Sequence, residues 1–311
     1  MKSAEEILAL ARKRYNATLL SFDYVNDELA VMRVQPDGGV PRYKAGQYTT
    51  LGLARAEARV EGTQEDTYDS DEAVKIVKRA YSIAHPVLNG SELYRVEEQN
   101  FHEFYIVLIR EDENSPPLLT PRLFALKPGD RLFCGDKIVG NYTLDRFYKT
   151  AKHVGEENAC VVFLATGTGE APHNNMTWRL LTDGFKGRIV SIVCARYQRD
   201  LGYIETQNRL MEKYPNYKYI SFTTREPGQR KRYIQDFIEE GELAALHDGF
   251  VDPERTHVYL CGNPAMIGIP KVADDQKTYP EPKGCVEILE KLGFESGRKH
   301  PHRNIHYEEY W

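Results

Sequence analysis

The stretch ACVVFLATGTGEAPHNNM, residues 159–176, joins an apolar run to a glycine-containing turn and then to a segment of helix length. A continuous apolar run is typical of a strand that is buried on both faces of a parallel sheet. Gly167 and Gly169 permit a tight turn and close approach of the backbone to a phosphate, and Pro172 suits the first turn of a helix. Since the pattern is not GxGxxG, the turn alone predicts either a phosphate-binding loop or a βα turn without a ligand.

The second half of the chain repeats this arrangement. Helix-length segments separate three further apolar runs, RIVSIVCAR (188–196), YKYISFTT (217–224) and THVYLCG (256–262). Apolar strands that alternate with helices predict a parallel α/β sheet. We therefore expect residues 156–311 to form a nucleotide-binding α/β domain.

The first half of the chain has a different pattern. A short helix is expected over residues 5–14, and short alternating runs bounded by Gly, Pro and Asn follow at 17–25, 28–39, 46–54, 79–86, 103–111 and 130–136. This pattern predicts an antiparallel β-barrel or sandwich over residues 1–155. The charged stretch at about 56–78 is interpreted as a long solvated loop or hairpin between two strands, with a docking segment as the alternative.

Composition limits the classes of function. The chain has 311 residues and a net charge of −5, so no general basic field exists for nucleic acid or membrane. No run of eighteen apolar residues is present, and the N-terminal segment lacks the apolar region of a secretory signal. Five scattered cysteines without CxxC spacing argue against iron–sulfur or zinc sites. A cytoplasmic protein with reduced thiols is the expectation.

Candidate ligand-binding residues follow the predicted strands of the second half. The motif CGNPAM (261–266) ends the last apolar run, where open α/β sheets bind ligands. Cys261 would line that crevice or serve as a small core residue. Arg196 and Arg225 follow two other strands, and Arg232 lies further on. These arginines predict either a site for a 2′-phosphate or a solvated basic rim.

The C-terminal segment is rich in histidine and aromatic residues. His300, His302 and His306 have no acidic or cysteine partner at metal-site spacing, so surface histidines and no metal site are expected. The chain ends in HYEEYW (306–311). Because an exposed terminal tryptophan is unfavourable, these aromatic residues are expected to pack on a flat surface rather than to fray.

Taken in order, the motifs resemble the bacterial ferredoxin/flavodoxin–NADP(+) reductase family. RAYS (79–82) resembles the family's RxYS strand, and GTGEAP (167–172) resembles its GTGIAP-type loop. Other segments match in the same order and spacing, from about Asn16 to Trp311: KAGQYTTLGL (44–53), EFYIVLI (103–109), LLTPRLFALKPGD (118–130), CGNPAM and HYEEYW. The resemblance implies a flavin-binding β-barrel followed by an NADP-binding α/β domain.

The resemblance also implies roles for individual residues. Arg79 would meet the flavin dinucleotide's pyrophosphate, Tyr81 would lie against the isoalloxazine, Ser82 would hydrogen-bond near flavin N5, and Cys261 would line the nicotinamide slot; Ser82, Tyr81 and Cys261 are the implied catalytic residues. The implied FAD-binding positions are Arg79, Ala80, Tyr81, Ser82, Tyr105, Leu118, Leu119, Thr120, Thr168, Tyr310 and Trp311. The implied NADP-binding positions are Thr168, Gly169, Ala195, Arg196, Thr224, Arg225, Arg232, Cys261, Gly262 and Asn263.

The implied reaction is electron transfer between NADP(H) and an acidic one-electron carrier, ferredoxin or flavodoxin, by hydride exchange with FAD. Basic stretches at 225–232 and 297–303 are expected to steer the carrier transiently. An oxygenase reductase component, a free-flavin reductase, an NADH enzyme and a non-enzymatic redox-sensing module on the same fold are the alternatives. Three departures stand out: Glu170 replaces an apolar residue in the glycine loop, and the segments 56–78 and 268–284 are longer than in typical members.

Overall fold

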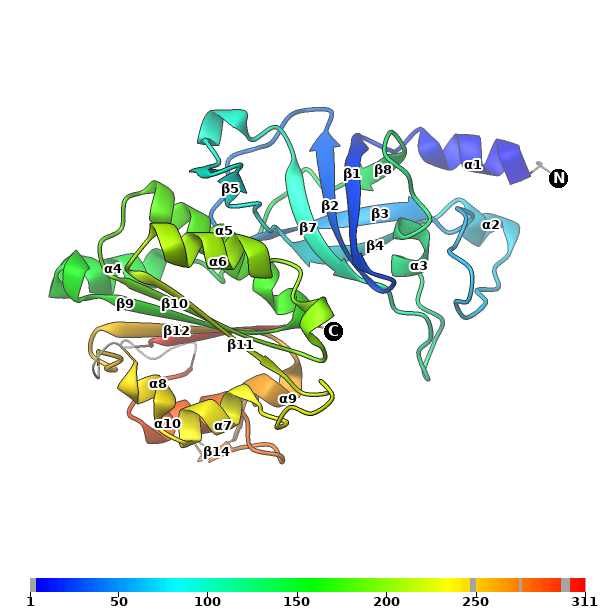
Figure 1. Ribbon diagram of the computed structural model, residues 1–311. Coiled ribbons are helices and arrows are strands. Elements are labelled where there is room, and N and C mark those ends of the chain that lie inside the picture. Colours follow the sequence, from blue (N-terminus) through cyan, green and yellow to red (C-terminus); the bar gives the residue numbers. More distant parts are fainter. Residues whose placement is uncertain (1–3, 247–249, 274–275, 298–302, 311) are drawn as a thin grey trace. The chain divides into compact units, whose positions relative to one another are not determined.

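The computed structural model describes all residues except 1–3, 247–249, 274–275, 298–302 and 311 (Figure 1). The chain divides into two compact units, residues 1–86 with 94–141 and residues 87–93 with 142–311. The second unit therefore resumes at residue 142, earlier in the chain than the boundary at 155/156 predicted from the sequence. Helix α4 (Asp145–Val154) belongs to the second unit because Phe147 packs edge-on against Phe185 and His257.

The first unit is built on an antiparallel sheet in the order β4-β3-β8-β1-β2-β7. Ala84, just after β4, forms a bridge with Glu103 of β7, and this bridge links the two ends of the sheet into the expected barrel. Alternate side chains from the strands fill a buried apolar core. The strands are β1 (Ala17–Asn26), β2 (Leu29–Pro36), β3 (Tyr48–Ala54), β4 (Ile76–Ser82), β7 (His102–Val107) and β8 (Arg131–Cys134), and the helices are α1 (Ala4–Arg12), α2 (Ser70–Ala73), η1 (Val96–Glu98) and α3 (Thr120–Leu123).

The long segment between β3 and β4 is anchored by buried charges, contrary to the expectation of a solvated loop. The Asp66 carboxylate accepts hydrogen bonds from Arg55 Nη2 at 2.6 Å and from Arg122 Nη2 at 2.7 Å. The side chains of Asp66 and Arg122 are almost completely buried. Burial alone would raise the pKa of Asp66, but the hydrogen bonds from the two guanidinium groups lower it below its usual value. The segment is therefore fastened to α3.

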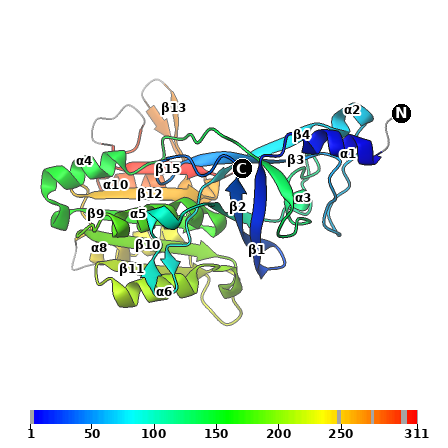
Figure 2. The same ribbon diagram turned by 90° about the horizontal axis from the view of Figure 1, so that it is seen from above.

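The second unit contains a parallel sheet in the order β11-β10-β9-β12-β15. Figure 1 shows α4, α5 and α6 on one face of this sheet and α7, α8, α9 and α10 on the other, and Figure 2 shows the sheet from above. The sheet strands are β9 (Cys160–Thr166), β10 (Arg188–Ala195), β11 (Tyr217–Thr223), β12 (Thr256–Gly262) and β15 (Ile305–Glu309). The helices are α5 (Glu170–Thr182), α6 (Ile204–Lys213), α7 (Ile234–Glu239), α8 (Glu242–Ala245), α9 (Pro264–Ile267) and α10 (Cys285–Lys291), with short turns η2 (Glu156–Asn158), η3 (Gly167–Gly169) and η4 (Gln198–Asp200).

Short paired strands complete the second unit. The hairpin β13 (Lys271–Ala273) and β14 (Gln276–Thr278) lies in the long 268–284 segment, and β5 (Leu88–Asn89) pairs with β6 (Glu92–Leu93). Of the helices in the described part of the chain, none has the length and apolar character needed to cross a bilayer.

The C-terminal segment differs from the expectation of a packed tail with surface histidines. Residues 305–309 form the fifth strand, β15, in parallel register with β12. His306 is buried and stacks on Tyr259, with ring centroids 4.4 Å apart, and on His257. Its position on the strand places the imidazole inside the second unit, so the surface expectation was wrong for His306. His300 and His302 lie outside the described residues.

Candidate active site

The glycine turn after β9 and the CGNP turn after β12 touch each other at the carboxyl ends of their strands. A side chain at Gly169 would place its Cβ only 2.2 Å from the carbonyl oxygen of Cys261. Gly262 has a φ of +120°, and its Cβ would lie 2.3 Å from Thr166 Oγ1. The Asn263 backbone N–H donates to the same hydroxyl at 2.7 Å. Both glycines are thus required by backbone packing at this edge.

The exposed side of the glycine turn has room for a ligand. Gly167 has a φ of +53°, and a Cβ there would meet nothing within 4 Å. The turn leads into α5, whose first residues are helical directly after it. Backbone N–H groups at such a turn and the N-terminus of a thirteen-residue helix suit a phosphate. The arrangement fits the phosphates of a dinucleotide, although Thr168 itself is buried.

Cys261 is fully buried, and burial raises the pKa of its thiol well above the usual range. A thiol in this state is neutral at ordinary pH and acts through its shape and its S–H group. The Tyr310 side chain contributes to the electrostatic environment of this thiol, and the Tyr310 backbone N–H donates to the Gly262 carbonyl at 3.0 Å. Tyr310, expected to contact the flavin, therefore lies beside the CGNP turn. Trp311 is outside the described residues.

Glu308 is a candidate that the sequence interpretation missed. It lies opposite Cys261 in the β12–β15 register, and its charge contributes to the raised pKa of the Cys261 thiol. The signal was present in the sequence as an acid two residues before Tyr310, but only the pairing of β15 with β12 brings it to this edge.

The two arginines after β10 and β11 lie on adjacent strand ends. The Thr224 N–H donates to the Ala195 carbonyl at 3.1 Å, and the Arg225 N–H donates to the Arg196 carbonyl at 2.8 Å. Both arginine side chains are exposed at this end of the sheet. Arg196 Nε lies 3.9 Å from Asp200 Oδ2. The expected group of Ala195, Arg196, Thr224 and Arg225 is thus brought together by the parallel register of β10 and β11.

Arg232 is engaged differently. Its guanidinium forms ion pairs with Glu240, at 2.6 Å, and with Glu242. It also packs against the rings of Phe222 and Phe237. Since two carboxylates already neutralise it, Arg232 has less charge to offer a phosphate than Arg225 has.

Glu170 turns away from the glycine loop into the interior. Its side chain accepts a hydrogen bond from Gln207 Nε2 at 2.9 Å and interacts with the Tyr219 hydroxyl. Gln207 also donates to Asn174 Oδ1 at 2.7 Å and accepts from the Tyr217 hydroxyl at 2.6 Å. Burial raises the pKa of the Glu170 carboxyl to about 7, although the hydrogen bond from Gln207 and the Tyr219 side chain act in the opposite direction. The conflict with a phosphate anticipated from the sequence is relieved by this orientation.

In the first unit, RAYS occupies the end of β4, an edge strand of the sheet. Arg79 and Ala80 are exposed, Tyr81 is half-buried with its ring edge-on to Phe104, and Ser82 is 7% exposed. Because β3 is the one strand of the described chain that pairs with β4 along its length, half of the backbone N–H and C=O groups of β4 point away from the sheet. An exposed arginine and a half-buried tyrosine on such an edge fit a flavin dinucleotide.

The other expected flavin positions in the first unit are largely covered by protein. Tyr105 is buried on β7, and Leu119 is buried ahead of α3. Leu118 and Thr120 are partly exposed, and Thr120 Oγ1 accepts from the Ile109 N–H at 3.1 Å. The hydrogen bond holds the start of α3 against the chain that follows β7.

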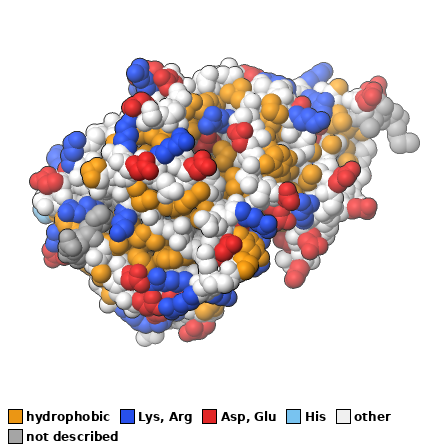
Figure 3. All heavy atoms as spheres, in the orientation of Figure 1, with side chains coloured by type: hydrophobic (Ala, Val, Ile, Leu, Met, Phe, Trp, Pro, Cys, Tyr) orange, Lys and Arg blue, Asp and Glu red, His pale blue; other side chains and the backbone are white. Residues whose placement is uncertain are grey.

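Two further expectations concern charge and metals. In the 225–232 stretch, Arg230 and Arg232 both pair with Glu240, so much of the expected basic surface is neutralised. Figure 3 shows acidic and basic side chains interspersed on the visible face. In the 297–303 stretch only residues 297 and 303 are described. The described residues contain no group of three metal-ligating side chains.

Comparisons with known proteins agree with this geometry. The family described as oxidoreductase NAD-binding domain matches residues 163–271. The flavodoxin/ferredoxin–NADP reductase of Shigella flexneri is 30% identical over 229 residues, which cover 72% of this chain and 76% of that protein. The protein of the same name from Escherichia coli (strain K12) is also 30% identical, over 231 residues, with the same two coverages.

Solved structures show the same fold. The ferredoxin NADP+ reductase of Neisseria gonorrhoeae with bound FAD and NADP superimposes with a TM-score of 0.66 at 19% identity, covering 95% of this chain and 98% of that one. The ferredoxin–NADP+ reductase of Plasmodium falciparum with 2′P-AMP has a TM-score of 0.63 at 14% identity, covering 96% and 97%. On the sequence identities and coverages together, the chain belongs to the flavodoxin/ferredoxin–NADP reductase family of oxidoreductases.

Proposed function

We propose that this protein transfers electrons between NADP(H) and a one-electron protein carrier, ferredoxin or flavodoxin, with FAD as its resident cofactor. The observation that carries this proposal is the contact between the Gly169 turn and the CGNP turn, flanked by two exposed arginines on adjacent strands. Family membership supports the same activity. When bound, FAD supplies the conversion between a two-electron hydride and single electrons.

The second unit would hold NADP(H). Backbone groups of the glycine turn at 167–169 would face the phosphates, and Asn263 would lie at the adjacent turn. Arg196 and Arg225 would bind the 2′-phosphate, because a guanidinium matches a phosphate in both charge and geometry. Arg232, held by two carboxylates, would support the rim of the site rather than contact the phosphate.

The first unit would hold FAD along β4. The Arg79 guanidinium would bind the pyrophosphate, and the half-buried Tyr81 ring would cover one face of the isoalloxazine. Ser82 would donate a hydrogen bond near N5, from a site with little water. On the nicotinamide side, the neutral Cys261 thiol and Tyr310 would shape the slot and exclude water, and Glu308 would hold or pass a proton at its carboxylate.

The experiment is an anaerobic titration of the purified protein, followed in the visible spectrum, with NADPH and separately with NADH. Bound flavin that is bleached by substoichiometric NADPH but slowly by NADH is the expected result. A colourless protein, or a flavin that NADPH does not reduce, would refute the proposal.

Two variants sharpen the test. Arg225→Ala should weaken NADPH about tenfold or more, the scale of one lost charge-assisted contact, and leave NADH unchanged. Arg230→Ala removes a nearby exposed arginine that pairs with Glu240 and is the matched control. Ser82→Ala should slow flavin reduction by up to about a hundredfold while flavin stays bound, and Ser82→Thr should recover much of the rate.

The nature of the carrier and the compartment are further parts of the proposal. The carrier would be acidic and would bind transiently. Because Arg230 and Arg232 are neutralised by Glu240, steering by the 225–232 stretch would be weak and sensitive to salt. The described cysteines are all free and buried, which suits a reducing compartment such as the cytoplasm.

A further inference from the structure

A cavity of about 730 Å³ opens at the amino end of the parallel sheet in the second unit. It lies where β12 and β15 begin, against helix α4, whereas the glycine and CGNP turns lie at the opposite, carboxyl ends of the strands. His257 at the cavity and Cys261 at the nucleotide edge are four residues apart on β12, which corresponds to about 13 Å. The cavity is therefore separate from the proposed NADP site.

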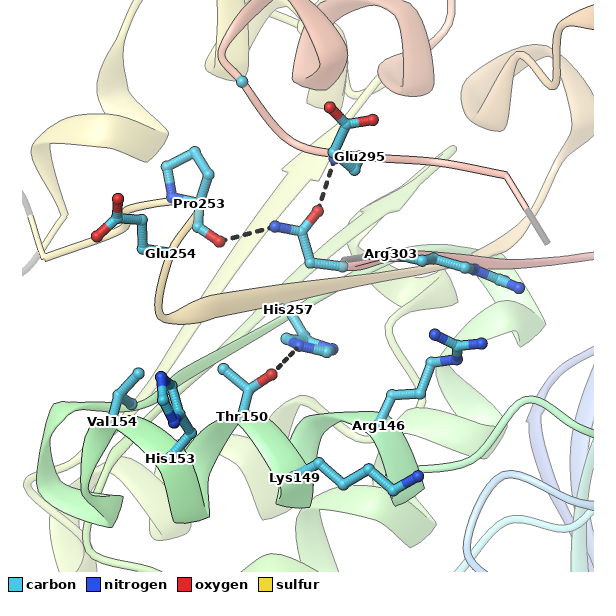
Figure 4. Close-up of a pocket in the computed structure, with 12 residues that line it drawn as sticks. Arg146, Lys149, Thr150, His153, Val154, Pro253, Glu254, His257, Glu295 and Arg303 are labelled. Carbon is cyan, nitrogen blue, oxygen red and sulfur yellow. Dashed lines mark hydrogen bonds between the residues drawn. The ribbon is translucent and has the colours of Figure 1, made fainter. Parts of the chain in front are cut away.

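The walls of the cavity are fixed by hydrogen bonds, as Figure 4 shows. Thr150 Oγ1 of α4 bonds to His257 Nε2 at 2.8 Å, and His257 Nδ1 bonds to His306 Nε2 at 2.9 Å. On the other side, Asn304 Nδ2 donates to the Pro253 carbonyl at 2.7 Å, and the Glu295 N–H donates to Asn304 Oδ1 at 2.7 Å. Four separate chain segments are thus held in place around a preformed cavity.

Basic side chains from two of these segments gather at one end of the cavity. Arg146 and Lys149 project from α4, and Arg303 comes from the residue pair just ahead of β15. Figure 4 shows their charged ends on the same side of the cavity. Burial lowers the pKa of His306 most, followed by the effect of His257, and the positive charges of Arg303 and Arg146 act in the same direction.

The α4 cations are available to a ligand. Within the described part of the chain, the side chains of Arg146 and Lys149 have no hydrogen bond or ion pair to another residue, and both are exposed. The imidazoles behind them are buried and held neutral by burial, so they add hydrogen-bonding groups without charge. Arg146 and Lys149, two neighbouring cations without a carboxylate partner among the described residues, favour a bound anion with more than one negative charge.

Two acidic residues also line the cavity, at separate places. Glu254 and Glu295 line it, and Figure 4 shows their carboxylates away from the three cations. Carboxylates accept hydrogen bonds and so favour hydroxyl or amino groups. The volume lies in the range of about 300–1,000 Å³ typical of organic ligands and exceeds what one phosphate ion fills.

We propose that this cavity binds a phosphorylated organic metabolite, with its phosphate at Arg146, Lys149 and Arg303 and its hydroxyl or amino groups toward Glu254 and Glu295. The inference goes beyond the reductase activity, because none of the proposed cofactor-binding residues lines the cavity. The ligand would be a free sugar phosphate or mononucleotide, or a second molecule of NADP(H).

The test is isothermal titration calorimetry of the FAD-loaded protein, with NADP⁺ added to saturate the arginines after β10 and β11. Ribose 5-phosphate, AMP, inorganic phosphate and ribose are the probes. We expect ribose 5-phosphate or AMP to bind more tightly than phosphate, and ribose not to bind. If neither ester binds, calorimetry with NADP⁺ alone decides whether NADP⁺ occupies the cavity. Two binding sites in the wild type and one in R146Q/K149Q would support the proposal. One site in both proteins would overturn it.

Matched variants make the result specific. R146Q/K149Q should weaken the bound ester at least about tenfold. K152Q/K186Q, which removes two exposed lysines outside the cavity, one of them also on α4, should not. E254Q should weaken ribose 5-phosphate but not inorganic phosphate. Equal weakening by both double variants would show binding to general surface charge and would overturn the proposal.

The readout is independent of the reductase reaction. Reduction of ferricyanide by NADPH should be unchanged in R146Q/K149Q, since neither residue belongs to the cofactor sites. A protein that lacks this activity yet binds ribose 5-phosphate would refute the proposed function and keep the cavity. An active reductase that binds no ligand at the cavity would refute the cavity proposal and leave the proposed function intact.

Discussion

Replacing Glu170 with glutamine should change the pH dependence of stability in a defined way. The carboxyl has a pKa of about 7 in the folded protein and an ordinary value of 4.5 when unfolded. Because the folded state binds the proton more tightly, unfolding free energy falls as pH rises from about 4.5 to about 7 and then levels off. A difference of about 2.5 pKa units corresponds to a loss on the order of 3 kcal/mol at pH 8. Glutamine keeps an oxygen to accept from Gln207 and has no charge to bury, so E170Q should be more stable by this amount at pH 8 and little changed at pH 4.5.

The assay is urea unfolding of wild type and E170Q between pH 4.5 and pH 8.5, with excess FAD in every sample. Fluorescence of Trp178, which is buried on the same helix as Glu170, reports on the second unit. The quantity of interest is the difference between the two proteins at each pH, because contributions from other titrating groups cancel in it. E205Q, on the exposed side of α6, is the matched control and should show no such difference.

A stability difference that does not vary with pH would refute the argument, since it would show that Glu170 does not take up the proton. The same variant also addresses nucleotide binding. Because the carboxyl points toward Gln207 rather than toward the glycine turn, the Kd for NADPH at pH 7 should change by less than about threefold. A large gain in NADPH affinity would mean that Glu170 repels the phosphates after all.

Three other changes test separate features of the structure. Asp66→Asn leaves the Arg122 guanidinium buried without its carboxylate and should destabilise the first unit by about 3–5 kcal/mol, measured by urea unfolding, whereas a loss below about 1 kcal/mol would contradict the buried pair. Gly169→Ala forces a Cβ to within 2.2 Å of the Cys261 carbonyl and should cost about 1–3 kcal/mol and most NADPH affinity, and a variant with unchanged Kd would show that the turns do not depend on this contact. Burial lowers the pKa of His173 to about 3, so the unfolded chain binds a proton at this residue more readily than the folded protein does. The unfolding free energy should therefore fall by about 2 kcal/mol between pH 6.5 and pH 5 because of His173. His173→Gln should remove this part of the pH dependence in the same unfolding assay.

The fold was accessible from the sequence because its signals are local. Each apolar run of the second half became a strand of the parallel sheet, and the alternating runs of the first half became the barrel. β15 was not expected, because IHYEE carries polar residues and only its first two are buried. An edge strand has one neighbour and one partly solvated face, so its sequence looks like that of a tail.

The parts of the candidate site that share a sheet edge were also predictable, because parallel strands end together. The motif positions at 168–169, 195–196, 224–225 and 261–263 do lie at these strand ends. The details that the sequence did not reveal depend on residues distant in sequence. Arg232 is neutralised by acids on α7 and α8, and Asp66 finds its partner 56 residues away. No local pattern reports such pairings.

Glu170 shows how a departure from a family motif should be judged. From its position in the glycine-loop sequence alone, Glu170 was expected to place a negative charge beside the phosphates. In the structure the residue belongs to the first turn of α5 and faces Gln207, whose amide is itself fixed by Asn174 and Tyr217. A protonated carboxyl there is a neutral hydrogen-bonding group, and a pKa raised to about 7 makes this form more populated at neutral pH than it is for an exposed glutamate. The substitution is therefore compensated by three polar residues on α5, α6 and β11 that no glycine-loop motif contains, and we expect nucleotide binding by the turn not to depend on an apolar residue at this position.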